Sequence, residues 1–438
     1  MSSTASPAPI AIIGAGPCGL TLARLLERAG IEYIVFERDA SAAPGRHNQG
    51  ASLDLHAGTG LAAIEAMGLM PEFKKLARQA ILTMQDSQGG NYMRVGTIPG
   101  EDAKKEDGAE KAEDFLAERP EIDRVQLRTL LLDSVPAHRV RWGKILRTIE
   151  RRAGSEAPGA AGWVLRFADG SEETGFRLIV GADGAWSKVR PLITAAKPRY
   201  SGKMYIEGRI AQGNPQYAAA QEMVGPGNSI AIGAKRVLLM QQTSDLTYRV
   251  YAGVEEPEGL SRPGGALDFA GDVEKARAAL FGLYAGWMPK LRALLEHADG
   301  PWRIWPLYTF VGADFPADKK NAGVDSTAWT RVAGVTLLGD AAHLGLPNGE
   351  GVNLAMLDAL NLFQSLTAEL GESGKGAFDD AADAAAIERA IVAYEAQMFP
   401  RARQHAEEGI FVNDMMYQAD GAERMIGMFK QFSEAGQA

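Results

Sequence analysis

A glycine-rich turn near the start of the chain constrains the fold most strongly. The apolar run 10–13 predicts a buried strand, and Gly14-Ala-Gly-Pro-Cys-Gly19 follows it directly, before a helical pattern that extends to Arg28. In this context Gly14 allows the tight turn, Gly16 lets the backbone approach a pyrophosphate, and Gly19 lets the helix pack closely on the strand. The pattern therefore predicts a Rossmann-like unit that binds a dinucleotide.

An acidic residue completes this motif. The second apolar run, 33–36, ends at Glu37, which stands 18 positions after Gly19, close to the roughly 20 expected for a carboxylate that binds the adenosine ribose. Pro17 is a further candidate for cofactor binding, and the N-terminal amides and positive dipole end of the helix suit phosphate groups. The alternative is a glycine-rich turn that only joins strand to helix, and the flanking elements together with Glu37 make it the weaker interpretation.

Composition limits the classes of function that the chain can serve. Its 438 residues suggest two or three domains. A formal net charge of -9 and an isoelectric point near 5.4 argue against binding of nucleic acid or an anionic membrane. The single cysteine, Cys18, is interpreted as a small buried residue, and the six histidines show no metal-ligand spacing, so no metal is expected. The absence of a signal sequence or a long apolar run favours the cytoplasm.

Two later segments repeat the combination of strand and glycine turn. Residues 178–181 form an apolar run before Asp183-Gly184, and residues 335–338 form another before Gly339-Asp340. The segment 349–353 then opens an amphipathic helical pattern. Because the nucleotide-binding motifs are spread over the whole chain, we predict an α/β fold with a discontinuous Rossmann-like domain. Its three segments are residues 8–80, 120–195 and 325–380.

These three ordered motifs resemble those of the single-component FAD-dependent aromatic hydroxylases, the family typified by p-hydroxybenzoate hydroxylase. The resemblance implies an FAD cofactor, with Asp183 and Gly184 holding the flavin pyrophosphate and the nicotinamide donor. The contacts that it implies at the far motif are Asp340 for the ribityl chain, and Pro347 with the backbone of Gly351, Val352 and Asn353 for the isoalloxazine.

Within that family, residues 50–56, 120–128 and 394–399 are most similar to the tetracycline-inactivating flavin monooxygenases. The similarity extends from about residue 10 to the C-terminal helix and is weak between about 195 and 330. The further contacts that it implies are Asp54 and Arg128 for the flavin, Arg38 beside the adenosine end, and Arg46 or His47 as the basic contact for the nicotinamide donor.

The chain also departs from the family pattern. The segment 344–350 (Leu-Gly-Leu-Pro-Asn-Gly-Glu) is about one residue shorter than the Pro-Phe-Ala-Gly type of segment usual there, which leaves the geometry at the flavin face open. The positions that match drug-contacting side chains of the tetracycline enzymes hold Glu207, Ser229 and Ala234. These three residues are our weak candidates for substrate contacts, and they count against tetracycline as the substrate.

A β-rich block forms the expected substrate-binding domain over residues 81–119 and 196–324. Its expected strands are 203–210, 237–242, 246–251 and 302–310, and its expected helices are 268–286 and 289–297. Residues 100–118 are charged without apolar periodicity and are interpreted as an exposed loop. Residues 383–432 predict a C-terminal helical segment that packs on both domains.

The resemblance implies a monooxygenase reaction on a small molecule. NADPH or NADH would reduce FAD, O2 would form a flavin C4a-hydroperoxide, and its distal oxygen would pass to a bulky cyclic substrate, aromatic or similar to a polyketide antibiotic. One alternative makes tetracycline the substrate. Another, from a different class, is a flavoprotein that does not oxygenate and serves as a reductase, an oxidase or a redox-sensing module. We expect a monomer.

Overall fold

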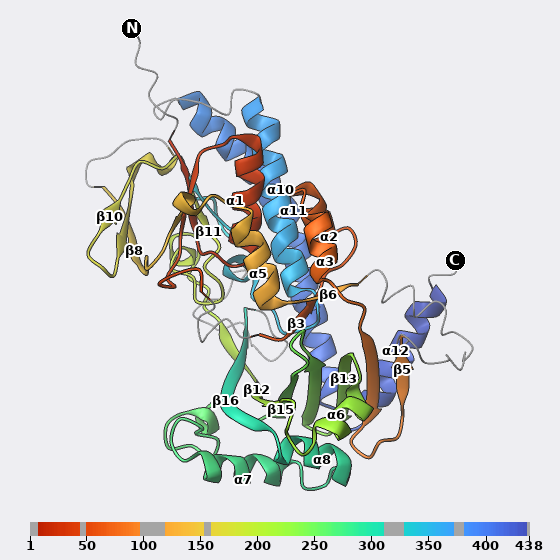
Figure 1. Cartoon of the computed structure of the whole chain (residues 1–438). Coiled ribbons are helices and arrows are strands. Elements are labelled where there is room, and N and C mark those ends of the chain that lie inside the picture. The colour runs from red at the N-terminus through yellow and green to blue at the C-terminus, as the bar shows by residue number, and fades with distance from the viewer. Residues whose placement is uncertain are drawn as a thin grey trace.

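The computed structural model describes residues 8–43, 50–96, 119–152, 159–310, 328–371 and 381–435. These residues form two lobes (Figure 1). The upper lobe contains a parallel sheet with helices packed beside it, and the lower lobe contains a larger, mostly antiparallel sheet. A long C-terminal helix runs from one lobe to the other.

The upper sheet has the strand order β17-β11-β1-β2-β7, and every neighbouring pair is parallel. Its strands are buried apolar runs, as expected where both faces of a parallel sheet are covered. They are β1 (Ile10–Ile13), β2 (Tyr33–Phe36), β7 (Val140–Arg141), β11 (Leu178–Gly181) and β17 (Val335–Leu337). The helices of this lobe are α1 (Pro17–Ala29), α2 (Gly60–Ala66), α3 (Met70–Leu76), α5 (Arg124–Asp133), α9 (Asp340–His343) and α10 (Gly351–Leu370).

Two small antiparallel sheets accompany the upper sheet. One lies at the outer edge of the lobe and consists of β8 (Leu146–Arg151), β9 (Trp163–Phe167) and β10 (Glu172–Glu173). The other pairs β3 (Ser52–Asp54) with β6 (Glu121–Asp123) near the junction of the lobes. Arg78 fastens this junction, because its guanidinium donates to Ser52 Oγ at 2.9 Å and to the carbonyl of Gln242 in the lower lobe at 3.0 Å.

The lower sheet has the order β16-β12-β15-β14-β13-β4-β5 and is antiparallel except between β4 and β13. Its strands are β4 (Ile81–Asp86), β5 (Met93–Val95), β12 (Arg199–Ile210), β13 (Gly227–Gly233), β14 (Arg236–Gln242), β15 (Tyr248–Glu255) and β16 (Asp299–Thr309). Alternate residues such as Ile206, Val250 and Leu238 form one buried core with the helices on the outer face. Those helices are α6 (Tyr217–Val224), α7 (Val273–Leu283) and α8 (Pro289–Glu296).

The C-terminal segment forms the expected helix pair, α11 (Ala381–Met416) and α12 (Gly421–Ala435). The first part of α11 packs along α10 in the upper lobe. Its end and α12 pack on the inner face of the lower sheet, where Met415, Met425 and Ile426 share a core with Ile232 and Val237. These methionines therefore pack the C-terminal helices on the lower sheet, and their burial is explained without a ligand.

Two expected elements begin later in the structure than the sequence pattern suggests. The helix predicted from residue 268 begins at Val273, because the Asp268 carboxylate accepts the amides of Gly264 and Ala270 and holds a loop instead. The strand predicted from Leu246 begins at Tyr248, since Leu246 has a φ of 62° in the preceding turn. The fold class itself is confirmed, whereas the expected loop at 100–118 lies outside the described residues.

Candidate functional site

The four sequence motifs meet at one edge of the upper sheet. Gly14 follows β1, Glu37 follows β2, Asp183 follows β11 and Asp340 follows β17, and these four strands are parallel neighbours. All four motifs therefore lie beyond the carboxyl ends of adjacent strands. This edge is where open α/β sheets bind ligands, in the crevice where the strand order reverses.

The glycine turn is closely packed on the protein side and open on the other. Gly14 has a φ of 109°, and a Cβ there would lie 2.4 Å from the Ala182 carbonyl oxygen. A Cβ on Gly19 would lie 2.1 Å from the Gly14 oxygen, whereas one on Gly16 would meet nothing within 4 Å. Pro17 begins α1, and no side chain caps the helix. The N-terminal amides of α1 are thus available to an anion beside Gly16.

Glu37 and Arg128 brace this turn from the side. The buried Glu37 carboxylate accepts the amides of Ala15 at 2.6 Å and Asp39 at 2.9 Å. Arg128, also buried, donates from Nε to the Ala15 carbonyl at 3.1 Å and from its guanidinium to Asp39 at 3.0 Å. Arg38 follows Glu37 and is exposed. Arg46 and His47 lie outside the described residues.

Asp183 presents a carboxylate oxygen that the described protein atoms leave unsatisfied. Its Oδ2 accepts the Lys188 amide at 2.6 Å, but its buried Oδ1 has no hydrogen-bond partner among the described residues. Burial raises the pKa of this carboxyl group. A buried acceptor without a partner is unusual in proteins. Oδ1 therefore fits a ligand that donates a hydrogen bond.

A buried ionic network supports the Asp340 turn. Asp340 is exposed, but Asp358, which is 0% exposed, accepts the Gly339 amide at 3.0 Å. Asp358 also accepts His343 Nε2 at 2.5 Å and the Arg401 guanidinium at 2.7 Å. Burial opposes ionisation of both partners, yet their pairing raises the pKa of His343 and lowers that of Asp358. His343 is thus a structural histidine of this turn.

The shortened segment 344–350 is held in place by α11. Asn413 donates to the Pro347 carbonyl at 2.8 Å, and His405 lies 3.2 Å from the Asn348 amide nitrogen. Burial lowers the pKa of His405 to about 4, so this histidine is neutral near pH 7. These contacts give the short segment a defined path towards Gly351, where α10 begins without a side-chain cap.

The first turn of α10 is also tied to the segment after β3. Asn353 is fully buried, accepts the His56 amide at 2.8 Å and donates to the Asp54 carbonyl at 2.9 Å. The side chain of Asn353 is thus used within the protein, whereas Val352 is half-buried and Gly351 is exposed. Asp54 is half-buried and lies beside this turn, so the structure brings Asp54 together with Gly351, Val352 and Asn353.

The three weak substrate candidates are not brought together. Glu207 on β12 and its cross-strand neighbour Tyr251 lie on the inner face of the lower sheet. This face is turned towards the upper lobe, since Tyr251 contacts the backbone of Ala51 there. Ser229 pairs with Met240 and lies on the outer face, which α6 to α8 cover, because side chains alternate along β13. Ala234 is exposed in the turn after β13. Only Glu207 is retained as a candidate.

Glu207 is buried on the inner face and is held there by polar neighbours. Trp305 Nε1 donates to one oxygen of its carboxylate at 2.8 Å, and Arg249 lies 3.5 Å from the other. Burial raises the pKa of Glu207 despite these partners. The neighbouring inner-face residues are half-buried, Leu239 against the core that α11 and α12 form on this face and Tyr251 beside Ala51 of the upper lobe.

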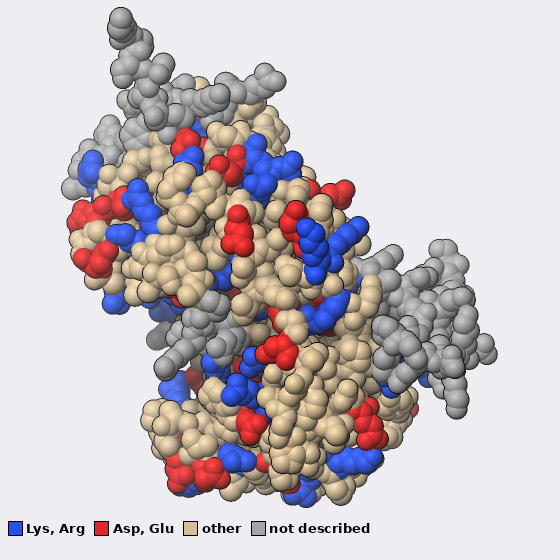
Figure 2. Space-filling view, in the orientation of Figure 1, with Lys and Arg blue, Asp and Glu red and all other residues tan. Residues whose placement is uncertain are grey.

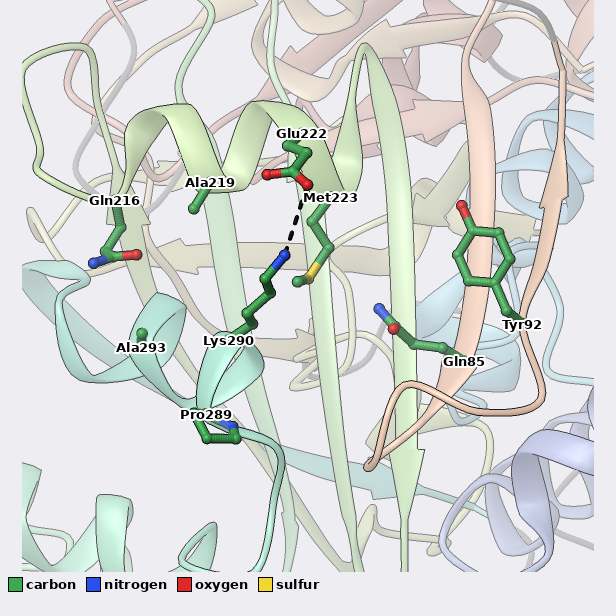
Figure 3. Close-up of a pocket in the computed structure, with 9 residues that line it drawn as sticks. All are labelled: Gln85, Tyr92, Gln216, Ala219, Glu222, Met223, Pro289, Lys290 and Ala293. Carbon is green, nitrogen blue, oxygen red and sulfur yellow. Dashed lines mark ion pairs between the residues drawn. The ribbon is translucent and has the colours of Figure 1, made fainter.

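A surface hollow of about 450 Å³ lies elsewhere, on the outer side of the lower lobe (Figure 3). It is bordered by α6, the start of α8 and the strand β4, with Glu222 and Lys290 forming an exposed ion pair at 3.7 Å across it. None of the nucleotide-binding motifs borders this hollow. Because the hollow lies away from these motifs, we do not assign the reaction to it, despite its size.

The distribution of surface charge, the apolar character of the helices and the arrangement of metal-ligating side chains also bear on function. Basic and acidic side chains are interspersed over both lobes on the face that Figure 2 shows. Within the described ranges, no helix combines the length and apolar character needed to cross a bilayer. In the same part of the chain, no group of three or more His, Cys, Asp or Glu side chains is arranged to hold a metal ion.

Comparison of the sequence with protein families decides the identity of the upper lobe. The family model described as an FAD binding domain matches residues 7–212 and 320–398. The chain belongs to this FAD-binding family. Its relatives include the monooxygenase penA of Penicillium thymicola, 30% identical over 95% of this chain and 97% of penA. Another is the 3-amino-4-hydroxybenzoate 2-monooxygenase PtnB3 of Streptomyces platensis, 30% identical over 80% of this chain and 77% of PtnB3. The chain is an FAD-dependent monooxygenase.

Two solved structures share this fold. Klebsiella pneumoniae HpxO, solved with FAD and uric acid, superposes with a TM-score of 0.69, 22% identity and coverage of 97% of this chain and 93% of HpxO. The tetracycline destructase Tet(51) superposes with a TM-score of 0.62, 17% identity and coverage of 98% of both chains. At these identities the likeness establishes the fold.

The residues present fit an FAD group. The uncapped start of α1 beside the open side of Gly16 suits a pyrophosphate, and Asp183 Oδ1 suits a hydrogen-bond donor. Sequence reasoning identified these positions but missed His56, Glu350, Asp358 and Arg401. One signal for Asp358 was present, since an acidic residue lies among the apolar positions of the α10 pattern. The others acquire their partners only through the fold.

Proposed function

We propose that this enzyme uses NADPH or NADH together with O2 to hydroxylate a bulky cyclic substrate, aromatic or similar to a polyketide antibiotic. The observation that carries the proposal is the convergence of four motifs at one edge of the parallel sheet of an FAD-binding monooxygenase. When bound, FAD would accept reducing equivalents from the nicotinamide donor and deliver one oxygen atom of O2 to the substrate. The protein supplies the position, the charge and the exclusion of water.

Each motif has a proposed role towards FAD. Gly14, Gly16, Pro17 and Gly19 present the amides of α1 to the pyrophosphate, where no side chain blocks the approach to Gly16. The proposed contacts elsewhere are Glu37 and Arg38 at the adenosine end, Asp183 beside the pyrophosphate, Asp340 at the ribityl chain, and Asp54, Pro347 and the Gly351, Val352 and Asn353 backbone at the isoalloxazine. Because the pyrophosphate only accepts hydrogen bonds, Asp183 Oδ1 would accept from a neighbouring FAD hydroxyl. Arg128 braces the Gly14 turn through the Ala15 carbonyl and is proposed as a further contact to the flavin.

The substrate is proposed to bind on the inner face of the lower sheet, opposite the flavin. This face offers the half-buried Leu239 and Tyr251 beside the carboxylate of Glu207. Its mixture of apolar surface and a few fixed polar groups is typical of sites for small organic ligands. Two similar proteins support a cyclic substrate. PtnB3 is named a 3-amino-4-hydroxybenzoate 2-monooxygenase, and HpxO was solved with uric acid.

The transient partners complete the proposal. NAD(P)H is proposed to approach near Asp183 and Gly184, with Arg46 or His47 as its basic contact. We also propose a monomer of the cytoplasm, which gel filtration with light scattering and fractionation of the source cells would test. An assembly larger than one chain, or recovery outside the cytoplasm, would refute these two parts separately.

The first prediction concerns the coupling of the reaction. With its true substrate, the purified enzyme is expected to consume NAD(P)H and O2 and to incorporate one oxygen atom from O2 into the product. The measurement is mass spectrometry after turnover in 18O2, with hydrogen peroxide assayed in parallel and with tetracycline and a panel of polycyclic phenols as substrates. Hydrogen peroxide equal to the NAD(P)H consumed, with no labelled product from any panel member, would contradict hydroxylation of this substrate class and favour an oxidase. Labelled tetracycline alone would favour the antibiotic alternative.

The second prediction tests the substrate face. Glu207→Ala is expected to raise KM by at least about tenfold, equivalent to about 1.4 kcal/mol, because it removes a fixed polar group from the proposed pocket. FAD affinity should stay unchanged. Ser229→Ala is the matched control, because Ser229 is equally buried on the opposite face of the same sheet. If the two variants change KM alike, the substrate does not bind on the inner face.

A further inference from the structure

His56 connects two carboxylates that come from opposite ends of the sequence. Its Nε2 lies 2.6 Å from Asp54 Oδ2, and its Nδ1 lies 2.9 Å from Glu350 Oε1. The imidazole is itself buried, with only 8% of its side chain exposed. A ring with a hydrogen bond to a carboxylate at each nitrogen is held most strongly as a cation, because only the cation donates from both nitrogens.

This bridge joins two segments assigned to the flavin site. Asp54 ends β3, and Glu350 immediately precedes the first turn of α10. Asn353 reinforces the same connection by accepting the His56 amide and donating to the Asp54 carbonyl. A Cβ on Gly60 would lie 2.5 Å from Asn353 Oδ1, so α2 also packs closely on this connection. The position of the α10 start thus depends on what holds His56.

The cation on His56 also balances the negative charge of the two carboxylates that it connects. In the described part of the chain, the charged groups that face it are Asp54, Glu350 and the Arg119 guanidinium, which lies 3.3 Å from Nε2. Without the cation on His56, these described groups would be two half-buried carboxylates and one guanidinium, which leaves one negative charge unbalanced. Like charges disfavour each other and any electron-rich group bound nearby.

We propose that His56 is a positioning residue for the flavin: as a cation between Asp54 and Glu350, it fixes the first turn of α10 and sets how tightly the site holds reduced relative to oxidised FAD. The inference rests on the proposed placement of the isoalloxazine beside Asp54 and Gly351. Two-electron reduction makes the flavin more electron-rich. A nearby cation therefore favours the reduced form, and an unbalanced carboxylate disfavours it.

The test compares the reduction potential of bound FAD in His56→Gln, Glu350→Gln and the double variant. His56→Gln is expected to weaken binding of reduced relative to oxidised FAD about tenfold, a fall of about 30 mV for a two-electron couple. Glu350→Gln should shift the potential in the opposite direction, because it removes the opposing charge. In the double variant, the ratio of the affinities for reduced and oxidised FAD should return to within about twofold of its value in the natural protein. The potentials are measured by equilibration with a reference dye, and FAD affinity by quenching of flavin fluorescence.

A merely structural role predicts a different pattern. Loss of packing would lower the unfolding temperature in both single variants without shifts of opposite sign, and such a pattern would overturn the proposal, as would unchanged potentials. Glu350→Gln keeps the contact between His56 and Asp54, so its upward shift tests the charge effect even if His56→Gln fails to fold. His297→Gln is the matched control, because His297 is exposed at the end of α8 in the lower lobe.

The pH dependence gives a second readout. Burial alone would lower the pKa of His56, but the hydrogen bonds to Asp54 and Glu350 raise it to about 9, above the value of about 6.5 in an unfolded chain. The stabilisation of the first turn of α10 by the His56 cation is therefore fully present below pH 6.5 and is lost as the pH rises through 9. FAD affinity should fall between pH 8 and about 10 in the natural protein. An equal fall in His56→Gln would overturn the assignment.

These results separate the inference from the proposed function. Binding and potential measurements require FAD but no substrate, NAD(P)H or O2. If the enzyme released only hydrogen peroxide while the potentials shifted as expected, the hydroxylation proposal would fail and the role of His56 would stand. If labelled product formed while the potentials stayed unchanged, the reverse would hold.

Discussion

Replacing Asp358 with alanine is expected to lower the free energy of unfolding by about 3–5 kcal/mol, because it leaves buried charges without their partner. Asp358 is fully buried and accepts hydrogen bonds from His343, Arg401 and the Gly339 amide. Water cannot replace these bonds without opening the contact between α10 and α11. The measurement is urea unfolding of the FAD-free protein, since bound FAD would itself stabilise the native state.

The variant should also change the response to pH. Pairing lowers the pKa of Asp358, so its contribution to stability is present above about pH 3.9 and is lost as the pH falls through the native value. Pairing raises the pKa of His343, so that contribution is present below about pH 6.5 and is lost as the pH rises through its native value. Both are therefore present between about pH 4 and 6.5. The loss in Asp358→Ala should be largest in this range.

A matched control distinguishes the network from a general effect of removing an acid. Asp420 has 60% of its side chain exposed and lies 4.0 Å from Arg424. Asp420→Ala is expected to change the free energy of unfolding by no more than about 0.5 kcal/mol, because exposed ion pairs contribute little. An equally small change in Asp358→Ala would show that the network is not what holds α10 and α11 together.

Local patterns predicted the nucleotide-binding half of the site. The strand at 10–13, the turn through Gly14 and Gly19 and the helix after Pro17 form one contiguous segment, so their geometry depends on neighbours in the sequence. Glu37 was identified for the same reason, since it ends the next strand. Backbone requirements of this kind are visible in one sequence because each glycine is needed at a fixed spacing.

The ionic networks depend on contacts that no local pattern contains. His56 and Glu350 are 294 positions apart and meet because β3 and the start of α10 lie side by side. His343 meets Asp358 where α9 packs on α10, and Arg401 joins them only because α11 packs on α10. The resemblance therefore proposed the cofactor segments, while the charges that surround them became visible only in the fold.

The substrate candidates show a second limit of sequence reasoning. Ser229 was selected by matching the part of the chain where similarity to the family is weakest. Its strand, β13, pairs with both β4 and β14, and this register places Ser229 on the outer face with Met240. A shift of one residue exchanges the faces of a strand. Matching the sequence to the family, without knowledge of the strand register, thus could not assign Ser229 to a face of the sheet. Glu207, selected in the same way, lies on the inner face.

Gly19→Ala and Gly16→Ala are both expected to weaken FAD binding, but for different reasons. At Gly19 the new methyl group would lie 2.1 Å from the Gly14 carbonyl oxygen, a backbone atom that cannot move without displacing the turn. Stability and FAD affinity should therefore fall together. At Gly16 the methyl group would meet no protein atom within 4 Å, so the protein should fold normally.

The Gly16 variant isolates the approach of the cofactor. Because the added methyl group would occupy the space proposed for the pyrophosphate, FAD affinity should fall by at least about tenfold, about 1.4 kcal/mol, while the unfolding of the FAD-free protein stays within about 0.5 kcal/mol of the natural protein. Fluorescence titration with FAD and urea unfolding measure the two quantities. Gly282→Ala, at another open position on the exposed side of α7 in the lower lobe, controls for replacing glycine, although alanine is expected to stabilise that helix slightly. Unchanged FAD affinity in Gly16→Ala would mean that the pyrophosphate does not cross the start of α1, and the assignment of every contact measured from that point would have to be revised.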